Sequence, residues 1–449
     1  MDFLYKGKRI SSVSFIGFGR SNKALFSYLK KRYPHLSFII RSDTEIKDEP
    51  EGAELRLGRD SLSGLCEDLI FLSPTVRRDR RELSIAKVRG SIISQDAEFF
   101  FENTKADCYA ISGSDGKSTT ATLSALLLKA RYGTARAIGN IGIPLTDCLD
   151  GNSDAAYAVE LSSFQLTEFF PKSKRAALIN ITPNHLDWHR DFDEYVSSKL
   201  NLMKNAGEKV FSFDSDLTRK IAENDRAFAL FSASYTLQEM KNTITAELYF
   251  NISDGFICQN GLRLIPTEDV LKNEIHNLKN LMAALALTYG AWDKESAIEA
   301  ARTFGGLPHR CELILKCHGL KVYNSSIDSS PERTKSTLAS FHEPHVILLG
   351  GRSKGLDYSI LAKALGKNTR CAVITGENRH EILNAIKGTG LPIYIKSDFE
   401  DAVKFALSLS YSIGALLFSP ASTSFDSFRN FEERAEVFKE IIFKNIKDI

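Results

Sequence analysis

A glycine-rich turn at residues 113–119 constrains this 449-residue chain more than any other feature. The apolar run Cys108-Tyr109-Ala110-Ile111 precedes the turn and predicts a strand, and residues 119–130 after it predict a helix. Glycines let backbone N–H groups turn around phosphate oxygens, and a helix amino terminus adds positive potential. The sequence therefore predicts a phosphate-binding loop made of Gly113, Ser114, Asp115, Gly116, Lys117, Ser118 and Thr119.

Two kinds of side chain in this loop suit nucleotide chemistry. Lys117 can reach terminal phosphates, and the hydroxyl of Ser118 or Thr119 can ligate Mg²⁺. The two glycines stand closer together than in the usual Walker pattern. A glycine turn with a chance lysine is therefore the alternative interpretation.

Short apolar runs alternate with helical segments along the whole chain. Near the amino terminus, Val13-Ser14-Phe15-Ile16 leads into a turn that contains Gly17 and Gly19, and residues 346–349 lead into another glycine turn. This alternation predicts an α/β protein whose parallel sheets bind ligands at the carboxyl ends of their strands. The first turn lacks the third glycine of a dinucleotide site, so we favour no such site there. We expect residues 211–265 to form a small side sheet.

Composition excludes several classes of protein. The chain is 43% hydrophobic and 25% charged, as in soluble globular proteins, and its formal net charge of +2 gives no reason to expect nucleic acid as a partner. The seven scattered cysteines predict reduced thiols. We find no apolar stretch of about 18–20 residues and no signal-peptide pattern, so we expect a cytoplasmic protein without a membrane partner.

Two further segments place metal-binding side chains after predicted strands. Glu160 follows the strand at residues 155–159, where an acid can hold Mg²⁺ against phosphates. The polar turn at residues 182–189 carries His185 and His189. A solvated acid and ordinary surface histidines are the alternatives.

In their order along the chain, these motifs resemble the Mur ligase family, the ATP-dependent amide-bond-forming enzymes of peptidoglycan precursor synthesis. Besides the phosphate loop, the resemblance rests on Gly139-Asn140-Ile141-Gly142-Ile143-Pro144, His276-Asn277-x-x-Asn280 and Leu307-Pro308-His309-Arg310. It implies an α/β fold of three domains. These are a Rossmann-like UDP-sugar-binding domain at 1–104, a P-loop ATPase-like central domain at 105–305 and a Rossmann-like amino-acid-binding domain at 306–449.

Residues 160–166 and 419–434 resemble the branch of the family that adds D-glutamate. The resemblance implies a ligase that joins D-glutamate to UDP-N-acetylmuramoyl-L-alanine through an acyl phosphate, a step that serves cell wall biogenesis, cell shape and cell division. It also implies ATP, two Mg²⁺ ions and a carbamylated Lys199, and we expect a monomer. Two alternatives stay open: a folylpolyglutamate-type or related ligase with another amino acid, and a non-catalytic nucleotide-binding regulator.

The resemblance assigns residues to four roles. The catalytic residues would be Lys117, His185 and Lys199. The metal ligands would be Ser118, Glu160, His185 and Lys199. Besides the loop, the nucleotide contacts would be Asn277, Asn280 and Arg310. The substrates would be held by Arg20, Ser21, Ser73, Asn140, His185, Ser329, Lys354, Ser424, Phe425 and Phe431.

Several positions depart from the family pattern. Asn184 stands where an acid is usual, and Ser325 replaces an aspartate. In the first domain, Arg41 stands where an acid usually meets the uridine. The charged run at residues 77–81 follows the uridine-side loop, and we interpret this run as a solvated surface rather than a diphosphate site.

Overall fold

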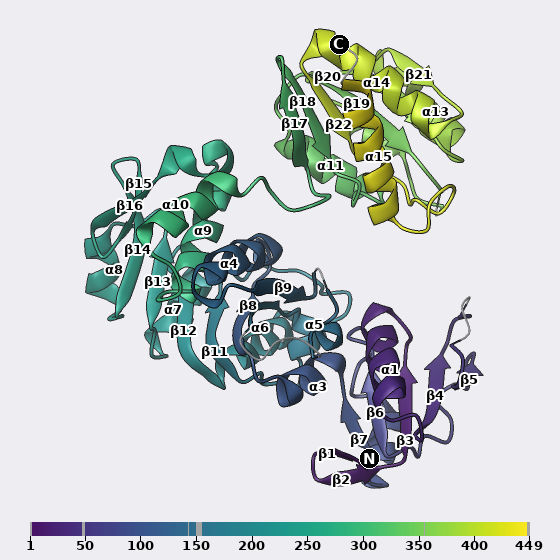
Figure 1. The fold of residues 1–449 in the computed structure, drawn as a ribbon, viewed down its shortest axis with the longest axis vertical. Helices are drawn as coiled ribbons and strands as arrows, with labels where there is room; N and C mark the ends of the chain where they lie inside the picture. Colours follow the sequence, from purple (N-terminus) through teal and green to yellow (C-terminus); the bar gives the residue numbers. More distant parts are fainter. Residues whose placement is uncertain (1, 47–49, 142, 150–154, 354, 447–449) are drawn as a thin grey trace. The chain divides into compact units, whose positions relative to one another are not determined.

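The chain divides into two compact units, Met1–Phe304 and Gly305–Ile449, each built on mainly parallel sheets (Figure 1). The computed structural model describes residues 2–46, 50–141, 143–149, 155–353 and 355–446. The predicted α/β class is confirmed. The predicted domain boundaries at residues 104 and 305 stay predictions.

The first sheet is parallel throughout and runs in the order β5-β4-β3-β6-β7. Its strands are β3 (Ser12–Ile16), β4 (Ser37–Ser42), β5 (Glu54–Leu57), β6 (Leu69–Leu72) and β7 (Ile92–Ser94). This is the order of the first five strands of the Rossmann fold, and it reverses between β3 and β6. Buried aromatic rings such as Phe15 and Phe71, with centroids 5.7 Å apart, hold the sheet's core together.

Three helices and a hairpin surround the first sheet. They are α1 (Arg20–Arg32), α2 (Arg81–Val88), α3 (Asp96–Asn103) and the hairpin of β1 (Phe3–Tyr5) with β2 (Lys8–Ile10). The helix α1 buries Leu25, Phe26 and Leu29 at helical spacing, which is why this segment folds as an amphipathic helix.

The second sheet has nine strands in the order β16-β15-β14-β13-β12-β11-β8-β10-β9. They are β8 (Asp107–Ser112), β9 (Ala135–Gly139), β10 (Ala156–Glu160), β11 (Ser173–Leu178), β12 (Ala206–Ser212), β13 (Ala229–Ser232), β14 (Leu248–Ser253), β15 (Phe256–Gln259) and β16 (Leu262–Pro266). The expectation of a separate side sheet is wrong. The strand β13 is buried along its whole length and pairs in parallel with β12 and β14, so residues 211–265 extend the central sheet.

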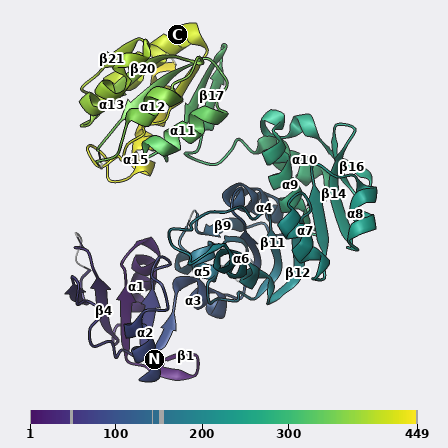
Figure 2. The ribbon, with the colours of Figure 1, turned by 180° about the vertical axis from the view of Figure 1, so that it is seen from behind.

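Helices cover both faces of the second sheet, as Figure 2 shows from behind. One face packs against α4 (Lys117–Tyr132), α9 (Ile275–Leu287) and α10 (Lys294–Thr303). The other face packs against α5 (Ser163–Leu166), α6 (Phe192–Leu200), α7 (Asp216–Glu223) and α8 (Leu237–Thr243). The carboxyl ends of β8, β10 and β11 therefore meet at one edge of a rigid layer.

The second unit has one sheet in the order β17-β18-β22-β19-β20-β21. Its strands are β17 (Glu312–Cys317), β18 (Leu320–Asn324), β19 (His345–Gly350), β20 (Thr369–Thr375), β21 (Ile393–Ile395) and β22 (Ala415–Phe418), all parallel except β17. Its helices are α11 (Pro331–Ser340), α12 (Ser359–Ala364), α13 (Arg379–Ile386), α14 (Phe399–Ile413) and α15 (Phe431–Ile446).

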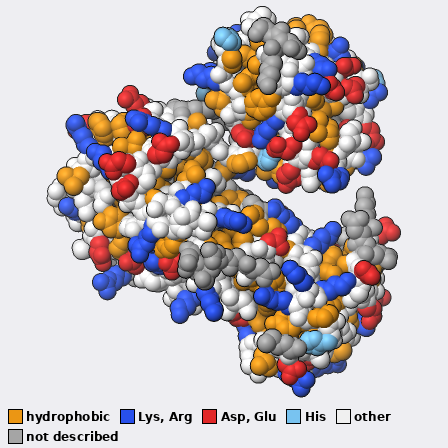
Figure 3. Space-filling model, viewed as in Figure 1, with side chains coloured by type: hydrophobic (Ala, Val, Ile, Leu, Met, Phe, Trp, Pro, Cys, Tyr) orange, Lys and Arg blue, Asp and Glu red, His pale blue; other side chains and the backbone are white. Residues whose placement is uncertain are grey.

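Basic and acidic side chains are interspersed on the face of the molecule seen in Figure 3. Such mixing matches the small net charge of +2. Among the helices that the structure describes, none combines the length and apolar character that a membrane crossing requires.

Candidate active site

The phosphate loop lies between β8 and α4, as the sequence predicts. Gly116 caps the helix with a left-handed φ of +78°. A Cβ at this position would lie 2.3 Å from Asn280 Oδ1, and a Cβ at Gly113 would lie 2.5 Å from Ile179 Cγ1. Both positions therefore require glycine, and the loop backbone is held close to α9 and β11.

Neighbouring side chains fix the shape of the loop. Asn180, just beyond β11, accepts hydrogen bonds from the backbone N–H groups of Ser114 and Asp115 at 2.8 and 2.9 Å. The Ser114 hydroxyl lies 2.8 Å from the Tyr195 hydroxyl of α6. Lys117 Nζ donates to the Ser114 carbonyl at 2.8 Å. The loop is thus pre-shaped without a ligand, as electrostatic binding of phosphates requires.

Glu160 ends β10, the strand beside β8, and its side chain is 1% exposed. One carboxylate oxygen accepts from the Ser118 hydroxyl at 2.8 Å, and the other accepts from Asn140 Nδ2 at 3.2 Å. The structure therefore brings together Ser118, Glu160 and Asn140, which the sequence places in three separate motifs.

The donor set around Glu160 fits Mg²⁺. Oxygens on adjacent corners of an octahedral Mg²⁺ shell lie about 3 Å apart, and the Ser118 and Glu160 oxygens are 2.8 Å apart. Within the described residues, no group of three or more His, Cys, Asp or Glu side chains forms a metal site by itself. A metal at this loop would therefore take part of its shell from other oxygens, such as the Ser118 hydroxyl and substrate phosphates.

Lys199 lies on α6 with its side chain 2% exposed. Its Nζ donates to the Gly113 carbonyl of the phosphate loop at 2.6 Å. Burial lowers the pKa of this ammonium group to about 7, and the nearby charge of Lys117 acts in the same direction. A large share of the amine is thus neutral near neutral pH.

His185 lies in the turn after β11, with an uncommon left-handed φ of +54°. Its ring centroid is 4.9 Å from that of Phe164. Partial burial lowers the pKa of His185, Asp187 opposes that shift, and the charges of Lys117 and Lys199 add to it. The imidazole is therefore neutral at physiological pH, which is the form that binds metals.

Both asparagines expected to contact the nucleotide are buried on α9. Asn280 directs Oδ1 towards the loop, 3.5 Å from the Thr120 hydroxyl. Asn277 donates to the Leu271 carbonyl at 3.0 Å. Asn280 thus lies against the phosphate loop, whereas Asn277 is held by the preceding turn.

In the first sheet, the predicted substrate residues gather where the strand order reverses. Arg20 and Ser21 begin α1 after β3, and Ser73 follows β6. Gly17 has a φ of +73°, and a Cβ there would lie 2.9 Å from Ser73 Cβ. The two turns therefore touch only because residue 17 is glycine.

These geometries agree with what comparison with known proteins finds. Residues 111–288 match the family model described as Mur ligase middle domain. The protein of Acetivibrio thermocellus named "UDP-N-acetylmuramoylalanine--D-glutamate ligase" is 34% identical, over 98% of this chain and 98% of its own. The protein of the same name from Clostridium tetani is 33% identical, over 98% of this chain and 97% of its own. The chain belongs to the Mur ligase family.

Solved structures of Mur ligases share the fold. The UDP-N-acetylmuramate-alanine ligase of Thermotoga maritima has a TM-score of 0.57 at 19% identity, covering 97% of this chain and 99% of its own. The MurF of Acinetobacter baumannii has a TM-score of 0.53 at 12% identity, covering 97% and 94%. At such low identity the likeness shows the fold alone.

The remaining predicted residues of this Mur ligase lie in its second unit. Arg310 is exposed before β17, and Ser329 is half-buried before α11. Ser424 is 2% exposed after β22, whereas Phe425 is 55% exposed. The Phe431 ring lies 5.6 Å from that of His309. Lys354, like Gly142 of the Asn140 motif, lies outside the described residues.

Two charged residues behave differently from their sequence interpretation. Arg41 is fully buried and pairs with Glu67 at 2.6 Å, so it lies inside the first sheet's core rather than at a substrate surface. The sequence interpretation places Arg77 in a solvated run. In the structure it contacts Trp188, in the turn between β11 and α6, and Glu194 of α6. The partners Glu67, Trp188 and Glu194 all lie far along the chain from the arginines that they contact. No local sequence signal could therefore have identified these contacts.

Proposed function

We propose that this Mur ligase joins D-glutamate to UDP-N-acetylmuramoyl-L-alanine with ATP, as a monomer in the cytoplasm. The observation that carries the proposal is the assembly of Ser118, Glu160 and Lys199 around a pre-shaped phosphate loop. The relatives named for this ligation match the chain over nearly its whole length. The rival assignment, a nucleotide-binding regulator, would not need a buried amine against the loop.

The reaction must activate a carboxylate, because its oxygen is a poor leaving group. Transfer of the γ-phosphoryl group of ATP to the alanyl carboxylate gives an acyl phosphate and ADP. The amine of D-glutamate then attacks the acyl carbon, loses a proton and expels phosphate. In such transfers the protein chiefly positions the reactants and neutralises charge.

We assign the phosphate end of this chemistry to the loop. Backbone N–H groups of residues 113–119 and the Lys117 ammonium group would stabilise negative charge on the transferred phosphoryl group. Ser118 and Glu160 would hold one Mg²⁺, and His185 with a carbamylated Lys199 would hold a second. When bound, Mg²⁺ neutralises phosphate charge as a Lewis acid.

The environment of Lys199 favours a carbamate. Only a neutral amine attacks CO₂, forming an N–C bond and releasing a proton, and burial supplies that amine near pH 7. The product carries an anionic oxygen, which suits a hard cation. The buried Nζ position would thus change from a cation into a metal ligand.

We assign the substrate contacts to residues near the carboxyl ends of the strands. Arg20, Ser21 and Ser73 would hold the nucleotide sugar where the first sheet's strand order reverses. Asn140 and His185 would meet its acyl end, and Asn277, Asn280 and Arg310 would contact ATP. The D-glutamate contacts would come from Ser329, Lys354, Ser424, Phe425 and Phe431.

One assay tests the proposal. The purified protein is given ATP, Mg²⁺ and UDP-N-acetylmuramoyl-L-alanine, and phosphate release is measured against a panel of amino acids. We expect release with D-glutamate only, and none from the Lys117→Ala variant. Release with another amino acid would favour a related ligase, and no release with any of them would favour the regulator.

A further inference from the structure

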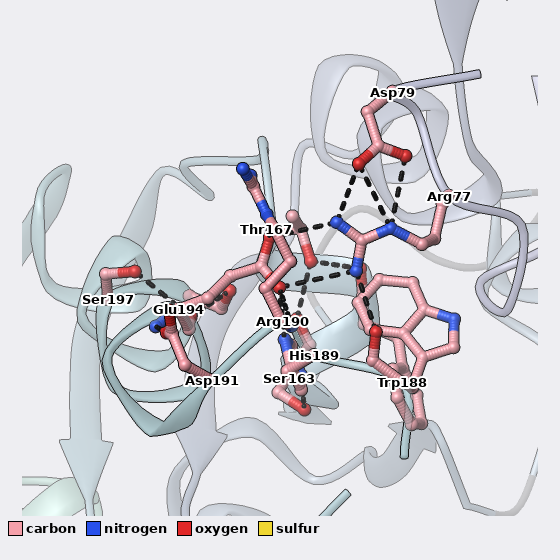
Figure 4. A network of polar contacts seen from close by, with 12 residues as sticks. Arg77, Asp79, Ser163, Thr167, Trp188, His189, Arg190, Asp191, Glu194 and Ser197 are labelled. Atoms are coloured by element: carbon pink, nitrogen blue, oxygen red, sulfur yellow. Dashed lines mark hydrogen bonds and ion pairs between the residues drawn. The ribbon is translucent and has the colours of Figure 1, made fainter. Parts of the chain in front are cut away.

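A polar junction ties the loop after β6 to the turn that carries His185. Figure 4 shows the Arg77 guanidinium group with Asp79 above it, Trp188 below it and Glu194 to its left, and Arg77 donates to Asp79 Oδ2 at 2.8 Å. The Arg77 guanidinium group donates to the Trp188 carbonyl at 2.7 Å and to Glu194 Oε1 at 3.1 Å. It also lies over the Trp188 ring, 4.9 Å from the ring centroid. In return, Trp188 Nε1 donates to the Thr75 carbonyl at 2.9 Å.

On the central side, the junction reaches two residues of the candidate active site. The backbone N–H groups of Trp188 and His189 both donate to the His185 carbonyl, at 3.1 and 3.0 Å. The turn is thus a single closed unit, and it holds His185 in its left-handed conformation. Such backbone strain persists only where the surroundings enforce it.

The second central-side contact is with α6. Glu194 lies in the first turn of this helix, which also carries Lys199. Glu194 further accepts from the backbone N–H of Arg190 at 2.6 Å, and its carboxylate lies 3.6 Å from His189 Nδ1. Arg77 therefore contacts both elements that place His185 and Lys199.

On the other side, the junction reaches the loop that follows β6. Ser73 donates its backbone N–H to the Ile16 carbonyl at 2.9 Å, and Val76 donates to the Ser73 carbonyl at 2.9 Å. Arg77 is the next residue along the chain. A ligand held between Ser73 and the turn after β3 would therefore set the position from which Arg77 extends.

The ion pair at the junction is partly shielded from solvent. The side chains of Arg77 and Glu194 are 24% and 12% exposed. Burial raises the pKa of Glu194, yet hydrogen bonds from Arg77 and Arg190 lower it to about 2. Partial burial and forked geometry make such a pair stronger than an ordinary surface ion pair.

We propose that Arg77 and Trp188 are positioning residues that couple nucleotide-sugar binding at the Ser73 loop to the placement of His185 and Lys199. The inference rests on the proposed function. Substrate bound at the first sheet would tighten the nucleotide and metal end of the site, and by thermodynamic reciprocity nucleotide would tighten the sugar site by the same factor.

Calorimetry on the full chain tests the coupling. The dissociation constant of UDP-N-acetylmuramoyl-L-alanine is measured alone and with a non-hydrolysable ATP analogue plus Mg²⁺, and kcat and KM are measured in parallel. The variants are Arg77→Ala, Arg77→Lys, which keeps the charge but loses the planar fork, and Trp188→Phe, which keeps a ring but loses the Nε1 donor. Arg81→Ala is the matched control from the same charged run, because Arg81 is exposed on α2.

We expect the analogue to tighten sugar binding about tenfold in the wild type and in Arg81→Ala. In Arg77→Ala the tightening should fall below about twofold, with kcat lowered at least about tenfold and sugar binding alone changed less than about threefold. For Arg77→Lys and Trp188→Phe, the tightening of sugar binding and kcat should lie between the values of the wild type and of Arg77→Ala. These results separate coupling from a merely structural contact. Loss of a structural contact would lower the thermal midpoint, but it would not change the ratio of the sugar dissociation constants measured with and without the ATP analogue.

Three results would overturn the inference: no tightening in the active wild type, tightening and kcat in Arg77→Ala equal to those of the wild type, or sugar binding alone that is lost together with stability. Should Arg77→Ala fail to fold, Trp188→Phe decides the question by the same ratio. Failure of the proposed function would look different, because the wild type itself would release no phosphate with D-glutamate.

Discussion

Arg41 and Lys199 of this Mur ligase are both buried, and their surroundings treat the positive charge in opposite ways. In the first sheet, Arg41 is fully buried and meets the Glu67 carboxylate at 2.6 Å. Its other guanidinium nitrogens donate to the Ser14 hydroxyl at 3.1 Å and to the Ser61 carbonyl at 2.6 Å. Beside the phosphate loop, Lys199 is equally buried but donates to a neutral carbonyl, and burial lowers its pKa to about 7.

The difference separates a structural charge from a reactive one. Removing a charge from water costs several kcal/mol unless a counter-charge and hydrogen bonds replace the water. The core around Arg41 supplies both, so this residue stabilises the fold. The core around Lys199 leaves part of that cost uncompensated, which disfavours the ammonium form and leaves an amine available for chemistry.

Replacement of Lys199 should give the largest effect and should separate activity from stability. We expect Lys199→Ala to lower kcat on the order of 10³-fold, because the carbamate that we propose to hold a metal beside the transferred phosphoryl group could no longer form. The thermal midpoint should stay the same or rise, since a poorly compensated buried charge is removed. Phosphate release and thermal unfolding measure the two effects.

Added acetate or formate should restore part of the Lys199→Ala activity by supplying a carboxylate. Lys204→Ala, on the exposed turn that follows α6, is the control and should keep wild-type activity. Failure of both carboxylates at every concentration would argue against the carbamate. A lowered midpoint with normal kcat would make Lys199 structural, like Arg41.

Replacement of Arg41 should show the opposite pattern. Arg41→Leu leaves Glu67 buried without its partner, so the free energy of unfolding should fall by about 3–5 kcal/mol. The double variant Arg41→Leu, Glu67→Leu should recover most of that loss, because two apolar side chains replace the pair. Urea unfolding of both variants measures the change. Unchanged stability with loss of nucleotide-sugar binding would instead place Arg41 in the substrate site.

The sequence predicts those parts of the site that consecutive residues encode. Gly116 adopts a left-handed φ of +78°, and a strand and a helix flank the loop, so the loop is recognisable locally. Glu160 is predictable because the carboxyl ends of parallel strands meet at one edge. The parallel sheets follow from the alternating pattern, although residues 211–265 extend the central sheet instead of forming their own.

What the sequence does not reveal depends on distant partners. Arg41 pairs with a residue 26 positions away and Arg77 with one 117 positions away, so both look like surface charges in their local context. The burial of Lys199 depends on packing of α6 against the phosphate loop, which helical periodicity alone does not specify. The character of a charged residue is therefore set by tertiary contacts, not by its neighbours in the chain.

A buried carboxyl group in the first unit extends the comparison to negative charge and gives the smallest effect. Asp96, at the start of α3, accepts from the Ser21 hydroxyl and from backbone N–H groups, while its Oδ1 has no partner among the described residues. Burial raises its pKa to about 6. Because the folded pKa is raised, the stability that protonated Asp96 contributes is complete below about pH 4 and is lost as the pH rises through 6.

Asp96→Asn should therefore raise the free energy of unfolding at pH 7.5 by about 3 kcal/mol and give no gain near pH 4. Asp68→Asn is the control of opposite sign. Burial raises the pKa of Asp68, but hydrogen bonds from Ser11 and Lys8 hold it well below the usual range, so this variant should lose stability at pH 7.5. Urea unfolding at both pH values decides between the outcomes. An equal gain from Asp96→Asn at both would mean that its charge is not what burial penalises, and the contrast drawn from Arg41 and Lys199 would then hold for cations alone.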